Sequence, residues 1–296
     1  MFVQVILPVF LIFALGYVGQ KRLRLDVRSL STASMYLMSP LLVFRTLYTA
    51  NIDRQYIYVT VYSLALCLIL IGCVKITARI RGYTKSEESG LILATAFMNS
   101  GNLGVPVILF AFGQAGLHYA IVIMVVQTIL MSTLGIYYAA KGSAAGEQAI
   151  ASVVKMPIIH AAVLGLLWNA WGWEVPRSLL QVIDFVADAA IPTIMLALGM
   201  QLAEIPLNRL DWEKVSFSLL SRLILSPVIA WCIAIWLPVD PLLKQVMVVA
   251  AAMPSAANTT MYSLQFGSEP KLVSGITLLS TVISAVSLTV VLGMLR

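Results

Sequence analysis

Two clusters of small polar residues interrupt apolar stretches of the chain, one between Ala94 and Gly113 and one between Val248 and Gly267. The polar and helix-breaking members are Asn99, Ser100, Gly101, Asn102, Gly104 and Pro106 in the first cluster, and Pro254, Ser255, Asn258, Thr259 and Thr260 in the second. Proline removes a backbone donor and clashes with the preceding turn, and glycine weakens the preference for a helix. Both stretches are therefore predicted to be helices that break near their centres.

A broken helix is suited to anion binding, because its second half begins with free N–H groups and about half a positive charge. Pro106 fits the first turn of such a half-helix. The amides of Asn99, Asn102 and Asn258 add donors, and neither cluster contains a basic residue. The sequence thus favours an anion site built from neutral donors. The alternative is that the small residues allow close helix packing and the Asn side chains join neighbouring helices.

The composition requires that these helices lie in a membrane. Hydrophobic residues make up 60% of the chain and charged residues 11%, and the mean hydropathy is +0.94. A soluble domain carries about 25% charged residues, so this chain could not cover a soluble surface with polar groups. A membrane-spanning helix needs about 20 mostly apolar residues. Ten apolar segments are present, at 2–19, 30–49, 55–77, 90–112, 115–139, 151–172, 178–202, 213–237, 242–266 and 270–295.

The net charge of +6 comes from basic residues that flank these segments and does not indicate a nucleic-acid partner. Thirteen Lys and Arg residues fall in the odd-numbered loops between segments, and three fall in the even-numbered loops. Cytoplasmic loops carry such an excess, so both termini are predicted to be extracytoplasmic in a chain that crosses the cell (inner) membrane. Cys67, Cys73 and Cys232 lie inside apolar segments without metal-ligand spacing, and we expect neither a metal nor a cofactor.

Corresponding residues recur in the two halves of the chain at offsets of 152 to 156 positions. The pairs are Pro40 and Pro192, Met98 and Met253, Asn102 and Asn258, and the dipeptides Phe112-Gly113 and Phe266-Gly267. Since five helices per repeat is an odd number, the second repeat would enter the membrane upside down, as in many secondary transporters. The alternative is a chance coincidence among residue types that membrane helices tolerate.

Two acids are predicted to lie within the membrane. Asp184 and Asp188 are one helical turn apart in the segment 178–202, and acids at membrane depth are candidates for a proton or cation relay. The alternative is that Asp184 lies near the membrane surface and Asp188 pairs within the helix bundle. Arg45, toward the end of the segment 30–49, either extends to the interface or meets a substrate carboxylate.

The order and spacing of several motifs resemble those of the auxin efflux carrier family, which includes plant auxin transporters and bacterial organic-acid carriers. The matching residues are Asn99 to Pro106; Val125, Gln127, Thr133 and Leu134; Pro157, Gly165, Leu166 and Trp168; Asp188, Ala189, Leu198 and Gly199; and Ala252 and Pro254. They extend over both halves of the chain. This match makes Gln127 a further candidate site residue.

The resemblance implies an all-α membrane protein of ten transmembrane helices in two inverted five-helix repeats. The repeats would be 1–140 and 151–296, joined by a short cytoplasmic linker at 141–150. The broken fourth and ninth helices would cross, with a small organic anion held at the crossing and carried by an elevator-type movement. It also implies a non-enzymatic carrier that forms a homodimer. The short linker differs from the long loop of the plant proteins, and Val43 replaces a serine, which favours an acid smaller than auxin.

Other functions remain open on the residues alone. A cation-coupled symporter or antiporter of the same architecture is expected to carry an adjacent acidic pair on a broken helix, and neither cluster contains an acid. An intramembrane aspartyl protease needs catalytic acids on two facing helices, whereas Asp184 and Asp188 share one. A receptor or channel without transport is a further alternative.

Overall fold

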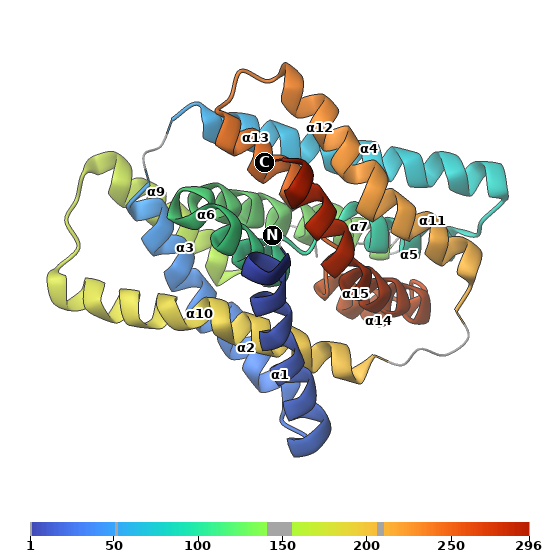
Figure 1. Cartoon of the computed structure of the whole chain (residues 1–296), viewed down its shortest axis with the longest axis horizontal. Helices are drawn as coiled ribbons and strands as arrows, with labels where there is room; N and C mark the ends of the chain where they lie inside the picture. Colours follow the sequence, from blue (N-terminus) through green and yellow to red (C-terminus); the bar gives the residue numbers. More distant parts are fainter. Residues whose placement is uncertain (1, 51–52, 141–155, 206–209, 296) are drawn as a thin grey trace.

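The computed structural model describes residues 2–50, 53–140, 156–205 and 210–295 (Figure 1). Within these ranges the regular structure is helical, apart from one antiparallel bridge between Met98 and Ser255. The prediction of an all-α fold is confirmed. The linker predicted at 141–150 lies outside the described residues.

The helices, with π-helical turns labelled η, follow the apolar segments in order. Those of the first half are η1 (Phe2–Ile6), α1 (Leu7–Leu23), α2 (Val27–Ala33), η2 (Ser34–Met38), α3 (Ser39–Tyr48), α4 (Gln55–Arg81), α5 (Lys85–Ala96), η3 (Ser100–Gly104), α6 (Val105–Leu130), η4 (Met131–Gly135) and α7 (Ile136–Ala139). Those of the second half are α9 (Pro157–Trp171), α10 (Arg177–Glu204), α11 (Trp212–Leu220), η5 (Ser221–Leu225), α12 (Ser226–Trp236), α13 (Pro241–Ala251), α14 (Asn258–Phe266) and α15 (Pro270–Met294).

Six stretches of continuous helix in the described residues are long and apolar enough to cross a membrane. They are Phe2–Leu23, Gln55–Arg81, Ser100–Ala139, Arg177–Glu204, Trp212–Trp236 and Pro270–Met294. The third of these is 40 residues long and is interrupted at Gly113, where φ is +66°. Gly113 lies between the segments 90–112 and 115–139 that the sequence predicts as separate helices. The apolar helices α9 and α13 are shorter. The chain is therefore a helical membrane protein with several spans, while the ten-span arrangement remains a prediction.

The helices pack in two groups (Figure 1). In the first group α1 lies along α10 and α3 lies along α9; in the second, α4 contacts α5 and α6, and α13 contacts α6 and α12. Small residues let the backbones of the first group approach each other. A Cβ atom on Gly16 would collide with the carbonyl of Leu196, and one on Gly199 with the carbonyl of Phe13.

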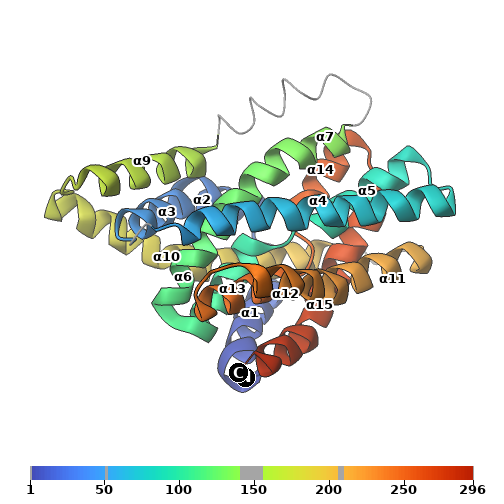
Figure 2. The ribbon, with the colours of Figure 1, turned by 90° about the horizontal axis from the view of Figure 1, so that it is seen from above.

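The first and last helices of the chain come close together near the start of the one and the end of the other (Figures 1 and 2). The N-terminal turn η1 also contacts the C-terminal helix α15. Chain ends on one face of a membrane protein require an even number of crossings.

Candidate functional site

Both predicted helix breaks are present, and they meet. The first is an extended segment from Phe97 to Asn99 between α5 and η3, and the second separates α13 from α14. The N–H of Asn99 donates to the carbonyl of Pro254 at 2.8 Å, and the N–H of Ala256 donates to the carbonyl of Phe97 at 3.0 Å. Backbone groups that the breaks free are thus satisfied by each other, as a membrane interior demands. We call this contact the crossing.

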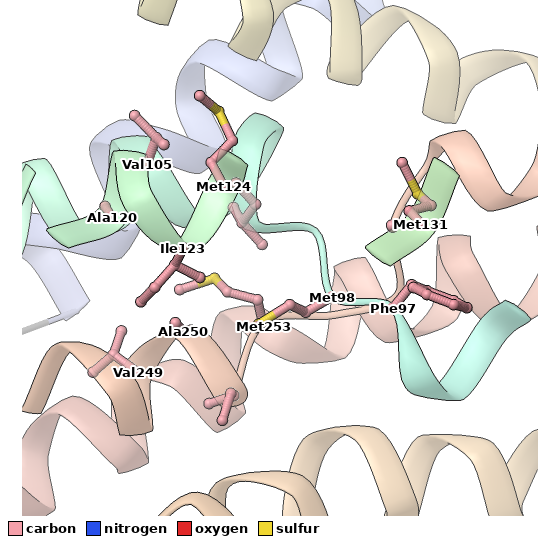
Figure 3. Close-up of a cluster of buried hydrophobic side chains, with 14 of the residues drawn as sticks. Phe97, Met98, Val105, Ala120, Ile123, Met124, Met131, Val249, Ala250 and Met253 are labelled. Carbon is pink, nitrogen blue, oxygen red and sulfur yellow. The ribbon is translucent and has the colours of Figure 1, made fainter. Parts of the chain in front are cut away.

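Apolar side chains enclose one side of the crossing (Figure 3). Met98 and Met253 lie next to each other where the two extended segments pass, and Ile123 of α6 lies beside them. Met98 is 3% exposed and Met253 is fully buried. The crossing is therefore part of the close-packed core of the protein.

Two half-helices begin at the crossing. One starts at Ser100 and continues through η3 into α6, and the other is α14, which starts at Asn258. Some of their first-turn N–H groups donate to carbonyls just before the helix, namely those of Ser100 at 2.8 Å and of Thr259 and Thr260 at 3.2 Å. The helix dipoles place partial positive charge at both starts.

A cavity of about 740 Å³ extends from the crossing. Six of the residues predicted from the sequence line it, namely Asn99, Ser100, Gly101, Asn102, Gln127 and Asn258. The other side of the cavity is formed by α2, η2 and α10, so it lies between the two helix groups.

Three polar side-chain atoms of the cavity lining are buried and have no hydrogen-bond partner in the protein. They are Nδ2 of Asn99, Oε1 of Gln127 and Oγ1 of Thr260. The Asn99 and Gln127 residues are 3% and 4% exposed. A buried polar group without a partner costs about 1–3 kcal/mol, so these atoms are suited to meeting a polar ligand that enters the cavity. Either amide can rotate to present its NH₂ group to an acceptor.

The remaining predicted residues of the clusters, which are Gly104, Pro106, Pro254, Ser255 and Thr259, do not line the cavity. They shape the backbone around it. Gly104 donates its N–H to the carbonyl of Asn99 at 2.9 Å, and Pro254 accepts the bridge bond from Asn99. The hydroxyl of Thr259 donates back to the carbonyl of Ala256 at 2.7 Å.

Charged residues at the mouth of the cavity were not predicted as part of the site. Among the described residues, the charged side chains that line it are those of Arg28, Lys271 and Glu204. Glu204 accepts a hydrogen bond from Gln20 at 2.9 Å. Two cations against one acid favour the entry of an anion. All three charged residues lie at helix ends next to odd-numbered loops, so the cavity leads from the crossing toward that side.

The two acids that the sequence predicts at membrane depth lie in a different place. Nη1 of Arg45 is 2.6 Å from Oδ1 of Asp188 and 3.6 Å from Oδ1 of Asp184, and it also donates to the Asp184 carbonyl at 3.3 Å. Arg45 and Asp188 line a second pocket of about 300 Å³ together with Phe110 and Gln114 of α6. The acids thus pair with Arg45 within the first helix group, where that group faces α6, and they do not line the crossing cavity.

Comparison with known proteins identifies the family of the chain. The family described as "Membrane transport protein" matches residues 1–156 and 141–292 of the chain. The chain belongs to this family. An "Uncharacterized transporter" of Methanothermobacter thermautotrophicus is 31% identical over 286 residues, which cover 94% of this chain and 91% of the relative.

The names of two further relatives mention the compound that each is thought to carry. A "Putative malonate transporter" of Rhizobium meliloti is 24% identical over 306 residues, covering 98% of this chain and 95% of the relative. A "Probable auxin efflux carrier component 1c" of Oryza sativa subsp. japonica is 24% identical over 127 residues, which are 41% of this chain and 22% of the relative. The predicted resemblance to the auxin efflux carriers is confirmed.

Proposed function

We propose that this membrane transport protein is a secondary carrier of small organic anions, with the substrate carboxylate held at the crossing. The observation that carries the proposal is the set of three unpartnered polar atoms, on Asn99, Gln127 and Thr260, in a cavity of about 740 Å³ beside two half-helix N-termini. Neutral donors and helix dipoles bind an anion and also let it leave. The name of the Rhizobium meliloti relative supports a carboxylate as substrate.

The architecture that we propose is ten transmembrane helices in two inverted repeats, 1–140 and 151–296. Met98 and Met253, which the sequence pairs, both lie in extended segments at the crossing. The paired residues Gly113 and Gly267 both have positive φ angles, of 66° and 72°. The neighbouring chain ends also fit an even number of spans (Figure 2).

The mechanism that we propose is an elevator-type movement. The second helix group, which contains the crossing, slides along the first group and carries the substrate with it. Both cavities lie between the two groups, and the larger one leads to the odd-numbered loops, which we assign to the cytoplasm. At the second pocket, Arg45 and Asp188 of the first group face Phe110 and Gln114 of α6, so their surroundings would change as α6 moves past α10, which makes Asp188 and its neighbour Asp184 candidates for coupling.

The proposed setting is the cell membrane, with both termini outside and the protein paired as a homodimer through the first helix group. The proposal is a non-enzymatic one, in which residues bind and release the substrate without changing its covalent bonds.

Uptake into proteoliposomes tests the proposed function. Purified protein is reconstituted, and labelled monocarboxylates and dicarboxylates are offered outside vesicles that hold the same unlabelled acid. We expect exchange of at least one small organic acid, and no exchange of auxin. Exchange of none of them, by protein that is folded in the vesicles, would refute an organic-anion carrier.

A further inference from the structure

Arg222, in η5, carries a fully buried guanidinium for which the described part of the chain shows no acidic partner. Its Nη1 donates to the carbonyl of Thr95 at 3.1 Å, and its Nη2 donates to the carbonyl of Ala251 at 2.6 Å and to the hydroxyl of Ser226. The Ser226 hydroxyl also donates to the Ala251 carbonyl, at 2.8 Å. Burying a charge without an opposite charge is strongly unfavourable, so the surroundings must supply negative potential.

The negative potential comes from two helix ends. Thr95 lies in the last turn of α5 and Ala251 is the last residue of α13, so both contacts are with the C-termini of half-helices that end at the crossing. Each C-terminus presents unsatisfied carbonyls and about half a negative charge. Together the two ends balance roughly one positive charge, which is the charge of the guanidinium.

The crossing therefore has two electrostatic sides. The half-helix N-termini face the cavity, and the half-helix C-termini face Arg222, which does not line the cavity. Carbonyl groups at the ends of broken helices are also what binds the coupling cation in many secondary transporters.

We propose that Arg222 is a resident cation that takes the place of a coupling cation at the crossing and makes transport independent of Na⁺. This inference rests on the proposed transport function. An arginine suits the position because its planar fork reaches carbonyls of two separate helices at once, which the single ammonium of a lysine does less well. The fixed positive charge also balances the negative potential of the two C-termini. The positive potential of the N-termini therefore acts fully on an anionic substrate.

The first test measures uptake with Na⁺ replaced by N-methylglucamine. Wild-type protein should take up substrate at the same rate in both media. Arg222→Met, which has a similar length but no charge, removes the donor of the Thr95 carbonyl and leaves the Ala251 carbonyl with the Ser226 hydroxyl alone, and its uptake rate should fall about tenfold or more. Arg79→Ala, which removes an exposed arginine of α4, is the matched control and should behave as wild type. Uptake that requires Na⁺, or a wild-type rate in Arg222→Met, would overturn the inference.

A second test does not depend on transport. Arg222→Ala leaves a space of the size of the lost side chain, and low millimolar guanidinium chloride should fill it. We expect guanidinium to raise the thermal unfolding temperature of Arg222→Ala, and its uptake rate where uptake is measurable, without raising either in wild type or Arg79→Ala. A variant that responds no more than wild type overturns the inference even if it folds poorly. If wild-type protein exchanges no organic acid, the proposed function fails, while this measurement still decides whether a guanidinium belongs between the helix ends.

Discussion

Replacing Asn99 by alanine should weaken substrate binding without weakening the fold. The Nδ2 atom of Asn99 is buried, lines the cavity and has no partner in the protein, so its removal breaks no internal hydrogen bond of that amide group. A hydrogen bond to a charged carboxylate contributes about 1.5–3 kcal/mol. We therefore expect the Asn99→Ala variant to bind substrate about 10- to 150-fold more weakly, since each 1.4 kcal/mol is a factor of ten.

Asn169 provides the matched control, because the NH₂ group of its side chain donates two hydrogen bonds inside the protein. Its Nδ2 donates to the carbonyls of Tyr48 at 2.7 Å and Ala50 at 2.8 Å, which ties α9 to the end of α3. Asn169→Ala leaves two carbonyls short of a donor and should lower the free energy of unfolding by about 1–3 kcal/mol, with substrate affinity unchanged.

The assay is KM for uptake in proteoliposomes, measured beside the thermal unfolding temperature in detergent. Asn99→Ala should change KM alone, and Asn169→Ala should change the unfolding temperature alone. Asn99→Asp keeps the volume but adds a negative charge, so it should bind an anion more weakly than Asn99→Ala does. A wild-type KM in Asn99→Ala would refute binding at the crossing. Equal losses of stability in both Asn variants would show that the amide of Asn99 is structural.

The remaining predictions concern the rest of the site, the packing, the coupling and the topology. Asn102→Ala and Asn258→Ala should each raise KM about five- to a hundredfold, from the loss of about 1–3 kcal/mol of binding, without lowering protein yield. Gly199→Ala should lower the unfolding temperature sharply, because a Cβ there collides with the backbone carbonyl of Phe13; an unchanged temperature would contradict the close packing of α1 on α10. If Asp188 carries a coupling proton, Asp188→Asn should abolish pH-driven accumulation and leave exchange partly intact, whereas unchanged pH dependence would make its pair with Arg45 structural. A C-terminal reporter that is active only in the cytoplasm should be silent, and an active reporter would exclude the proposed topology.

The helix breaks could be predicted because their causes are local. Pro254 lies in the second break, Pro106 fits near the start of the half-helix that follows the first break, and the surrounding Gly and Asn residues tolerate an extended backbone. The contact between the two breaks joins distant parts of the chain, so no local pattern predicts it. Only the recurrence of Met98 and Met253 and the family resemblance indicate that the breaks meet. The structure supplies the reason, since each extended segment satisfies backbone groups of the other.

The assignment of cavity residues could be predicted only in part. Thr260 lines the cavity and Thr259 points into the protein, and this difference depends on where α14 begins, because neighbouring residues on a helix face different directions. A shift of one residue would exchange them. Arg28 and Lys271 appear in the sequence only as loop charges, and their place at the cavity mouth results from tertiary packing.

The ion pairs could also be predicted only in part from the sequence. The sequence places Asp184 and Asp188 on one helix face, and the structure shows that both lie next to one basic residue, Arg45, which the sequence did not pair with them. That partner is 139 and 143 residues away along the chain, so nothing local identifies it. In the sequence, Arg222 is identified only as an arginine within the apolar segment 213–237. The role proposed for it depends on two carbonyls from other helices.

The separation of the charged group from the neutral donors explains how such a site can both select and release its substrate. A guanidinium beside Asn99, in place of the more distant Arg28 at the cavity mouth, would pair directly with a carboxylate, and a strong ion pair in a poorly solvated space dissociates slowly. Arg222 instead contacts the carbonyl ends of α5 and α13 and lies outside the cavity lining, so it favours anions through the electric field and not through contact. The direct contacts are left to groups such as Asn99, whose individual hydrogen bonds are weak enough to break in each cycle. Selectivity for negative charge and the strength of binding are thus determined by different residues. Substitutions at Asn99 should change affinity among anions, and substitutions at Arg222 should change whether a metal cation is needed at all.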